Sequence, residues 1–194
     1  LFDLYSKIFK KLNPTQKKLF MNISKKDINK KLRGVAGVNM DYSKKSAFSK
    51  FNFDKNPITK SKKVNILICT HCFFDNPHAY GEYKKSNLFI DFYEWINFLS
   101  KISHKTNYNW FIKPHRDYLP GTIEIISNMI KKFDNIKLVS PESSFHQLNL
   151  NLDHVLTVYG SVAHELPLLG VNVINASKIH PHMSYKFSTT PKNL

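Results

Sequence analysis

The sequence predicts an α/β protein: a Rossmann-like parallel sheet of about five strands with flanking helices, preceded by a helical arm. From residue 63 onward, short apolar runs alternate with amphipathic stretches, which implies parallel strands joined by right-handed crossovers. Before residue 35, lysine-rich stretches carry apolar residues at helical spacing. We therefore divide the chain into a basic arm (1–34), a polar, aperiodic linker (35–62) and a Rossmann-like domain (63–194).

The arm begins with an amphipathic helix. Leu4, Ile8 and Leu12 recur at every fourth position with lysines between them, so they form one apolar stripe. A basic amphipathic stretch of this kind suits the surface of an anionic membrane. The more ordinary alternative is that the stripe packs on the rest of the protein or on a further domain.

Start and stop signals divide the remainder of the arm. Asn13 as N-cap and Pro14 at the first helical position predict a second helix. Ser24 and Asp27 have capping-box spacing and indicate a third helix start. Gly34 is expected to end this last helix.

The domain alternates strands with helices. In such sheets, ligands bind outside the carboxyl ends of the strands, so the strand-to-helix loops are where a site is expected. The expected strands are 63–70, 109–114, 135–140, 154–160 and 171–176, and the expected helices are 86–103, 121–133, 143–150 and 161–170.

The chain is strongly basic, with a formal net charge of +15 from 29 Lys and Arg against 14 Asp and Glu. Such an excess favours anionic partners: nucleic acid, acidic lipids or phosphorylated substrates. Only Arg33 and Arg116 are arginines, and the abundance of Lys, Asn, Ile and Phe is also typical of AT-rich codon usage. Because no nucleic-acid-binding motif of known type is present, we expect no nucleic-acid partner.

Two cysteines do not make a disulfide framework, and they fit a reducing compartment. No run reaches the ~18 apolar residues of a membrane-spanning helix, and nothing resembles a cleavable signal peptide. We expect a cytoplasmic protein, peripheral to the inner membrane if the arm binds lipid.

The loop after the first strand reads "THCFFDNPHAYGEY", and its Cys72 forms a C-x-x-C with Cys69 at the end of the strand. A zinc site needs about four ligands, and no second Cys or His pair stands nearby at matching spacing, so we expect no metal. We expect His71, Asp75 and His78 to line a ligand cleft. Solvent-exposed loop residues are an equally good interpretation of all three.

The next two loops carry cationic and hydroxyl groups. Lys113, His115 and Arg116 crowd the end of the second strand and fit an anion such as a diphosphate. A basic surface turn is the alternative, and the rarity of arginine favours the site. Ser143 and Ser144 stand at a helix start, where N-capping explains one of them and a phosphate or sugar contact is the other use.

The loop after the fourth strand reads "YGSVAHELPLLG". Gly160 permits a backbone conformation that a side chain would forbid, and Ser161 stands at a helix N-terminus, which favours anions. Glu165 follows one helical turn later on the same face, where a carboxylate can accept both hydroxyls of a ribose. A simple turn with a cap and a favourable first-turn charge explains the same residues equally well.

In combination, these elements resemble the bacterial capsule and surface-polysaccharide glycosyltransferases of GT-B architecture. The matching elements, in order, are "THCFFDNPH", "LFIDFYEWINFLSKI", "WFIKPHRDY", "DHVLTVYGSVAHELPLLGVNVINA" and "MSYKF", within roughly residues 34–190. The resemblance implies one half of a GT-B enzyme, the carboxyl-terminal nucleotide-sugar-binding domain. It implies that Lys113, His115, Gly160, Ser161 and Glu165 hold the donor's phosphates and ribose. Arg116 departs from the family, which commonly has Pro there.

The resemblance implies a glycosyltransferase that takes a nucleotide-sugar donor and a saccharide acceptor, without a metal or other cofactor. Lys113 and Arg116 would offset the charge on the leaving phosphate, and His115 would donate a hydrogen bond or proton, with His71 and Asp75 as further catalytic candidates. GT-B enzymes need two Rossmann-like domains, so we expect an additional domain or a homo-oligomer. A nucleotide-sugar 2-epimerase of the same fold and a non-catalytic binding or scaffold module remain alternatives.

Overall fold

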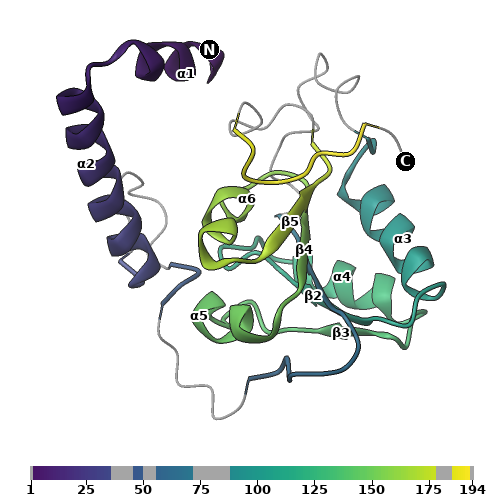
Figure 1. Ribbon diagram of the computed structural model, residues 1–194. Coiled ribbons are helices and arrows are strands. Elements are labelled where there is room, and N and C mark those ends of the chain that lie inside the picture. The colour runs from purple at the N-terminus through teal and green to yellow at the C-terminus, as the bar shows by residue number, and fades with distance from the viewer. Residues whose placement is uncertain (1, 36–45, 50–55, 72–87, 178–184, 193–194) are drawn as a thin grey trace.

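The computed structural model describes residues 2–35, 46–49, 56–71, 88–177 and 185–192. Five strands form one parallel sheet in the order β3–β2–β1–β4–β5 (Figure 1). This confirms the predicted α/β fold class with a Rossmann-like sheet. The strands are β1 (Asn65–Cys69), β2 (Asn109–Lys113), β3 (Ile136–Leu138), β4 (His154–Thr157) and β5 (Asn172–Asn175).

The central strand β1 is buried along its whole length, as its continuous apolar run predicts. Leu67 pairs in register with Phe111 of β2 and Val155 of β4. These three side chains belong to one core cluster, whereas Ile68 and Ile112, the next residues along, belong to the cluster on the other face. The alternation gives the sheet two separate cores.

The first core lies under helices α3 (Phe92–Ser103) and α4 (Thr122–Ile130). Trp95 and Ile126 point from these helices onto the sheet and are almost completely buried. Helix α3 begins later than residue 86 because the Asp91 side chain accepts a hydrogen bond from the Glu94 amide and fixes the N-cap there.

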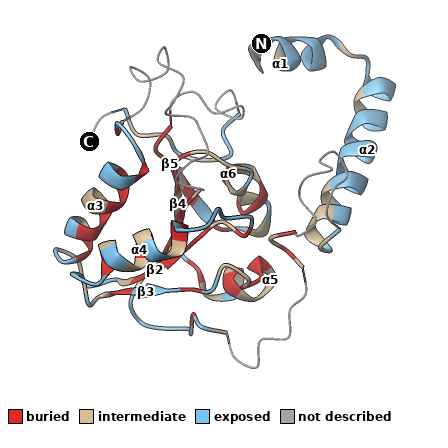
Figure 2. Ribbon diagram, turned by 180° about the vertical axis from the view of Figure 1, so that it is seen from behind, coloured by how far each residue is buried: buried red, intermediate tan, exposed pale blue. Residues whose placement is uncertain are grey.

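The second core lies under two short helices, α5 (Phe145–Leu148) and α6 (Val162–Glu165), and Figure 2 shows buried residues on both faces of the sheet. Phe48 and Ile58, from the segment interpreted as a linker, are fully buried in this core. Short 3-10 turns extend the two helices, η2 (Asn149–Asn151) after α5 and η3 (Pro167–Leu169) after α6.

The single helix expected over 161–170 is not formed. Helix α6 has only four residues, and Pro167, which has no amide hydrogen, then opens the 3-10 turn η3. Gly170, with a φ of +82°, ends the turn and leads into β5. The loop after β4 is therefore followed by one helical turn rather than by a long helix.

The arm consists of α1 (Phe2–Lys11) and α2 (Pro14–Leu32). The predicted cap is confirmed, since Asn13 and Gln16 form a reciprocal capping box at the start of α2. The expected third helix start is wrong, because α2 continues through Ser24 and Asp27. The helix ends before Gly34, whose φ is +86°.

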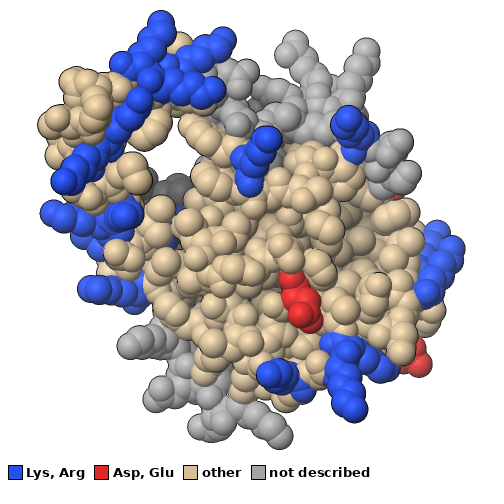
Figure 3. All heavy atoms as spheres, in the orientation of Figure 1, with Lys and Arg blue, Asp and Glu red and all other residues tan. Residues whose placement is uncertain are grey.

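Most large apolar side chains of the arm are not packed on the described part of the domain; Leu32, at the end of α2, is an exception. No residue of α2 is buried, and the exposed large apolar side chains of the arm are Leu4, Tyr5, Ile8, Phe9, Leu19, Phe20, Met21 and Ile23. The arm projects from one side of the domain, and basic side chains gather along it (Figures 1 and 3). No described helix is both long and apolar enough to span a bilayer.

Candidate functional site

The order of the strands places a topological switch point between β1 and β4. The chain runs from β1 outward to β2 and β3 and then returns to β4 on the other side of β1. At such a switch point, the loops after the two neighbouring strands diverge and leave room for a ligand. For the site predicted at the strand ends, this order makes the segments after β1 and β4 the first place to look.

His71, two residues after β1, lies close to Gly160, which follows β4. A Cβ atom on Gly160 would lie 3.4 Å from His71 Nε2. Gly160 does not have a positive φ, so the reason expected for this glycine is wrong. The backbone after β4 passes within van der Waals reach of the His71 ring, and a Cβ at this position would contact the ring.

His71 also connects the β1 loop with the β2 loop. Its ring stacks on that of His115, with centroids 5.1 Å apart and an interplanar angle of 15°. The ring of Phe92, at the start of α3, lies 6.2 Å from His71 in a similar orientation. Since Thr70 N donates to Lys113 O, the two strands stay side by side up to the histidines. The structure thus brings together His71, His115 and Gly160.

Glu165 is the buried carboxylate of this region. It ends α6, and only 4% of its surface is exposed. The ammonium of Lys31, at the end of α2, forms an ion pair with Glu165 Oε1. Glu165 N donates to Ser161 O, so the backbone turn between them is closed. An ionised carboxylate beside a strand-end loop is suited to accept hydroxyl hydrogen bonds.

Lys113 lies beneath the site rather than on its surface. It is buried, its Nζ donates to Pro141 O at 2.8 Å, and it stands 5.3 Å from the centroid of the Phe145 ring. Burial lowers the pKa of Lys113 from 10.5 to about 8. Burial also raises the pKa of the neighbouring Cys69 thiol to about 12, so Cys69 is a protonated core residue and not a nucleophile.

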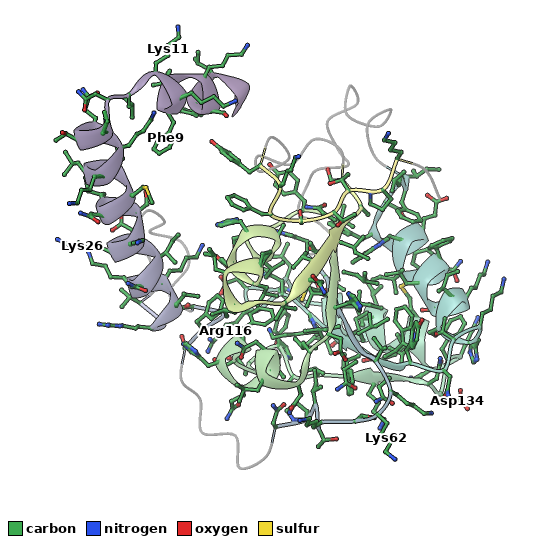
Figure 4. The ribbon with its side chains drawn as sticks, in the orientation of Figure 1. Phe9, Lys11, Lys26, Lys62, Arg116 and Asp134 are labelled. Carbon is green, nitrogen blue, oxygen red and sulfur yellow. The ribbon has the colours of Figure 1, made fainter. Side chains whose placement is uncertain are left out.

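Arg116 is a buried connector between three segments. Its Nη1 donates to Ser46 O, and its Nη2 pairs with Glu142 Oε2 at 3.1 Å. Only 6% of Arg116 is exposed, and it lies on the side of the domain from which the arm emerges (Figure 4). These contacts give Arg116 a structural role, and its predicted contact with a phosphate stays a prediction.

The three candidate serines lie in different surroundings. Ser144 is the N-cap of α5, where its Oγ accepts from His146 N at 3.3 Å, and Ser143 is buried beside it. Ser161 is exposed at the start of α6. Because α6 is a single turn, it lacks the aligned peptide dipoles expected to favour an anion at Ser161.

Asp75, His78 and Cys72 lie outside the described residues. Within the described part of the chain, no three His, Cys, Asp or Glu side chains are grouped so that they could hold a metal ion. Sequence reasoning missed two residues that touch the site, Phe92 and Lys31. Phe92 follows the acidic N-cap Asp91, a signal that could have placed it at the site end of its helix, whereas nothing near Lys31 in the sequence points to Glu165.

No family model matches this sequence, and no curated protein matches it. Among solved structures, the chain is similar to KpsC, a beta Kdo 2,7 transferase from Thermosulfurimonas dismutans, with 17% identity and a TM-score of 0.45, over 71% of this chain and 42% of that chain. It is also similar to the UDP-GlcNAc 2-epimerase of Neisseria meningitidis, with 20% identity and a TM-score of 0.39, over 58% of this chain and 28% of that chain. A third is the wall teichoic acid polymerase TagF, with 14% identity and a TM-score of 0.36, over 61% of this chain and 26% of that chain.

The chain spans less than half the length of each of these proteins. A Kdo transferase and a wall teichoic acid polymerase are among the structures it resembles. At these identities the similarity is one of fold.

Proposed function

We propose that this chain is the nucleotide-sugar-binding domain of a glycosyltransferase that builds a bacterial surface polysaccharide. The observation that carries the proposal is the convergence of three strand-end loops at the switch point. There His71 stacks on His115 and lies against Gly160. Glu165, one turn beyond Ser161 on the segment that follows β4, is buried and paired with Lys31. Imidazoles and an acceptor carboxylate on the loops of a switch point suit the phosphate and ribose of a nucleotide.

In this proposal each side chain has a distinct part. His115 donates a hydrogen bond or a proton to the phosphate of the leaving nucleotide, and His71, stacked on it, fixes the orientation of its ring. Glu165 accepts the ribose hydroxyls. Lys113 contributes positive charge from beneath the loops, since its ammonium is held in place by Pro141 O. The saccharide acceptor binds to a further domain or a second copy, as in a two-domain GT-B enzyme.

The proposal predicts that the chain binds a ribonucleotide and that Glu165→Gln weakens this binding by roughly 10- to 100-fold, the value of one charge-assisted hydrogen bond to a ribose hydroxyl. Isothermal titration calorimetry with CMP and UDP measures it. The matched control is Glu124→Gln, an exposed acid on α4, which should leave the affinity unchanged.

Three outcomes separate this proposal from its alternatives. Absence of binding to both nucleotides would remove the nucleotide site and leave a scaffold module. If a nucleotide binds, the products formed from the sugar donor decide the reaction: a transferred sugar supports the glycosyltransferase, whereas an epimerised donor would assign the chain to the 2-epimerases.

We also propose that the arm lies on an anionic membrane. Residues 1–34 hold ten Lys and Arg against two Asp, and Phe9 and Lys11 point to opposite sides of α1 (Figure 4). Leu4, Ile8 and Phe9 are each more than two-fifths exposed. Apolar side chains on one face and lysines on the other are what an interfacial helix requires.

This arrangement predicts that the full chain sediments with vesicles that contain equal parts phosphatidylglycerol and phosphatidylcholine, but not with pure phosphatidylcholine, and that high salt releases it. Leu4→Glu should lower the bound fraction several-fold, roughly the loss of one inserted leucine. Leu150→Glu, at an exposed leucine of the domain, is the control and should bind like the wild type. Equal sedimentation with both vesicle types would contradict the charge argument.

A further inference from the structure

The foot of the arm is firmly joined to the domain, although the rest of the arm is not. Leu32 packs against the core cluster that contains Phe48, Ala163 and Leu166. At Gly34 the backbone passes so close to the segment 46–49 that an added Cβ would stand 2.9 Å from Ser49 Cα. Helix α2 therefore ends at a fixed place on the domain, and Lys31 lies in its last turn.

Lys31 meets Glu165 from this fixed position. The two residues are 134 positions apart, and Lys31 Nζ pairs with Glu165 Oε1. Oε1 is the buried oxygen of the carboxylate, and within the described part of the chain it makes no hydrogen bond. An ionised carboxylate that is 95% shielded from water needs a counter-charge, and Lys31 supplies it.

The ion pair uses only one of the two carboxylate oxygens. No hydrogen bond joins Oε2 to the described residues. A carboxylate has about four acceptor sites over its two oxygens, so Oε2 can still accept from a ligand while Lys31 holds Oε1. Lys31 itself is 42% exposed on its side chain and loses little solvation in the pair.

We infer that Lys31 is a positioning residue of the nucleotide site: it fixes the charge and orientation of Glu165, so that the free oxygen accepts the ribose diol. The inference rests on the proposed function of Glu165 and extends it to a residue of the arm. Lys31 touches neither the nucleotide nor the sugar, and it acts only through the carboxylate. The arm is then part of the donor site as well as a basic appendage.

The test compares a ribonucleotide with its 2′,3′-dideoxy analogue, because only the ribonucleotide can use Glu165. The wild-type chain should bind UDP or CMP, whichever binds more tightly, at least about tenfold better than the dideoxy form. Lys31→Met should bring this ratio close to one and leave the affinity for the dideoxy form unchanged. Lys31→Arg should restore the preference, and Lys26→Met, at an exposed lysine of the same helix, should not alter it.

A double-mutant cycle guards against a folding defect in Lys31→Met. In a Glu165→Gln background there is no carboxylate to position, so Lys31→Met should not change the ratio further. A ribose preference that survives Lys31→Met overturns the inference and leaves the proposed function intact. A wild-type chain that binds a nucleotide without a ribose preference overturns the role of Glu165, and the inference with it. A wild-type chain that binds neither nucleotide overturns the proposed function.

Discussion

Phe48→Ala is expected to lower the free energy of unfolding by about 3–5 kcal/mol, the cost of removing a buried aromatic ring. The Phe48 side chain is completely buried, and its ring centroid lies 5.6 Å from that of Phe145 and 5.6 Å from that of His146. The segment is also held by its backbone, since Phe145 N donates to Ala47 O at 3.0 Å. Urea denaturation followed by circular dichroism measures the change.

The matched control is Phe20→Ala, at a phenylalanine of α2 that is half exposed. It should change the free energy of unfolding by no more than about 0.5 kcal/mol, as is usual for surface positions. A small loss at Phe48 would mean that the segment 46–49 is a true linker whose packing is dispensable. The predicted large loss would instead make it part of the domain, next to Arg116 and the foot of the arm.

The five strands were predictable because each is a short apolar run that alternates with helical patterns. In β1 the run is nearly continuous because the strand is buried on both faces. The burial of Phe48 and Ile58 in the core was not predictable, since single apolar residues in a polar stretch have no periodicity. Helix α2 runs past Ser24 because a serine that can cap a helix is also tolerated inside one.

The candidate site was predictable in part for a similar reason. His71, His115 and Gly160 follow strands, and parallel strands bring their carboxyl ends to one edge, so sequence order alone puts these residues together. The partners of charged groups follow no such rule. Arg116 pairs with Glu142 and donates to Ser46 O, and Glu165 pairs with Lys31. Most of these contacts join segments that lie far apart in the chain.

Lys113→Met is expected to stabilise the fold near neutral pH while it weakens nucleotide binding. Burial lowers the pKa of Lys113 from 10.5 in the unfolded chain to about 8, so keeping the charge in the folded state at pH 7 costs about 3 kcal/mol. Methionine has a similar shape and no charge. It leaves Pro141 O without its donor, which costs about 1 kcal/mol, so a net gain of about 2 kcal/mol is expected.

The pH dependence of the free energy of unfolding distinguishes this effect from ordinary repacking. In the wild type, above pH 8 the unfolded chain binds more protons at Lys113 than the folded chain does, so stability rises by about 1.4 kcal/mol per pH unit. Above pH 9 the unfolded chain loses the Cys69 proton, which the folded chain keeps up to about pH 12 because burial raises that pKa. The two slopes then cancel, and stability levels off up to about pH 10.5.

Lys113→Met should abolish the rise between pH 8 and 9. Above pH 9 the stability of the variant should fall, because the Cys69 slope is no longer cancelled by that of Lys113. Urea denaturation of both proteins at pH 7, 8, 9 and 10 resolves these slopes.

A variant less stable than the wild type at pH 7 would show that the ammonium, bonded to Pro141 O and lying over the Phe145 ring, is a net stabilising group. If the variant is more stable but binds nucleotide as well as the wild type, the charge beneath the loops serves neither folding nor binding. A more stable variant with weaker binding would show that the fold retains an unfavourable buried charge for the benefit of its ligand.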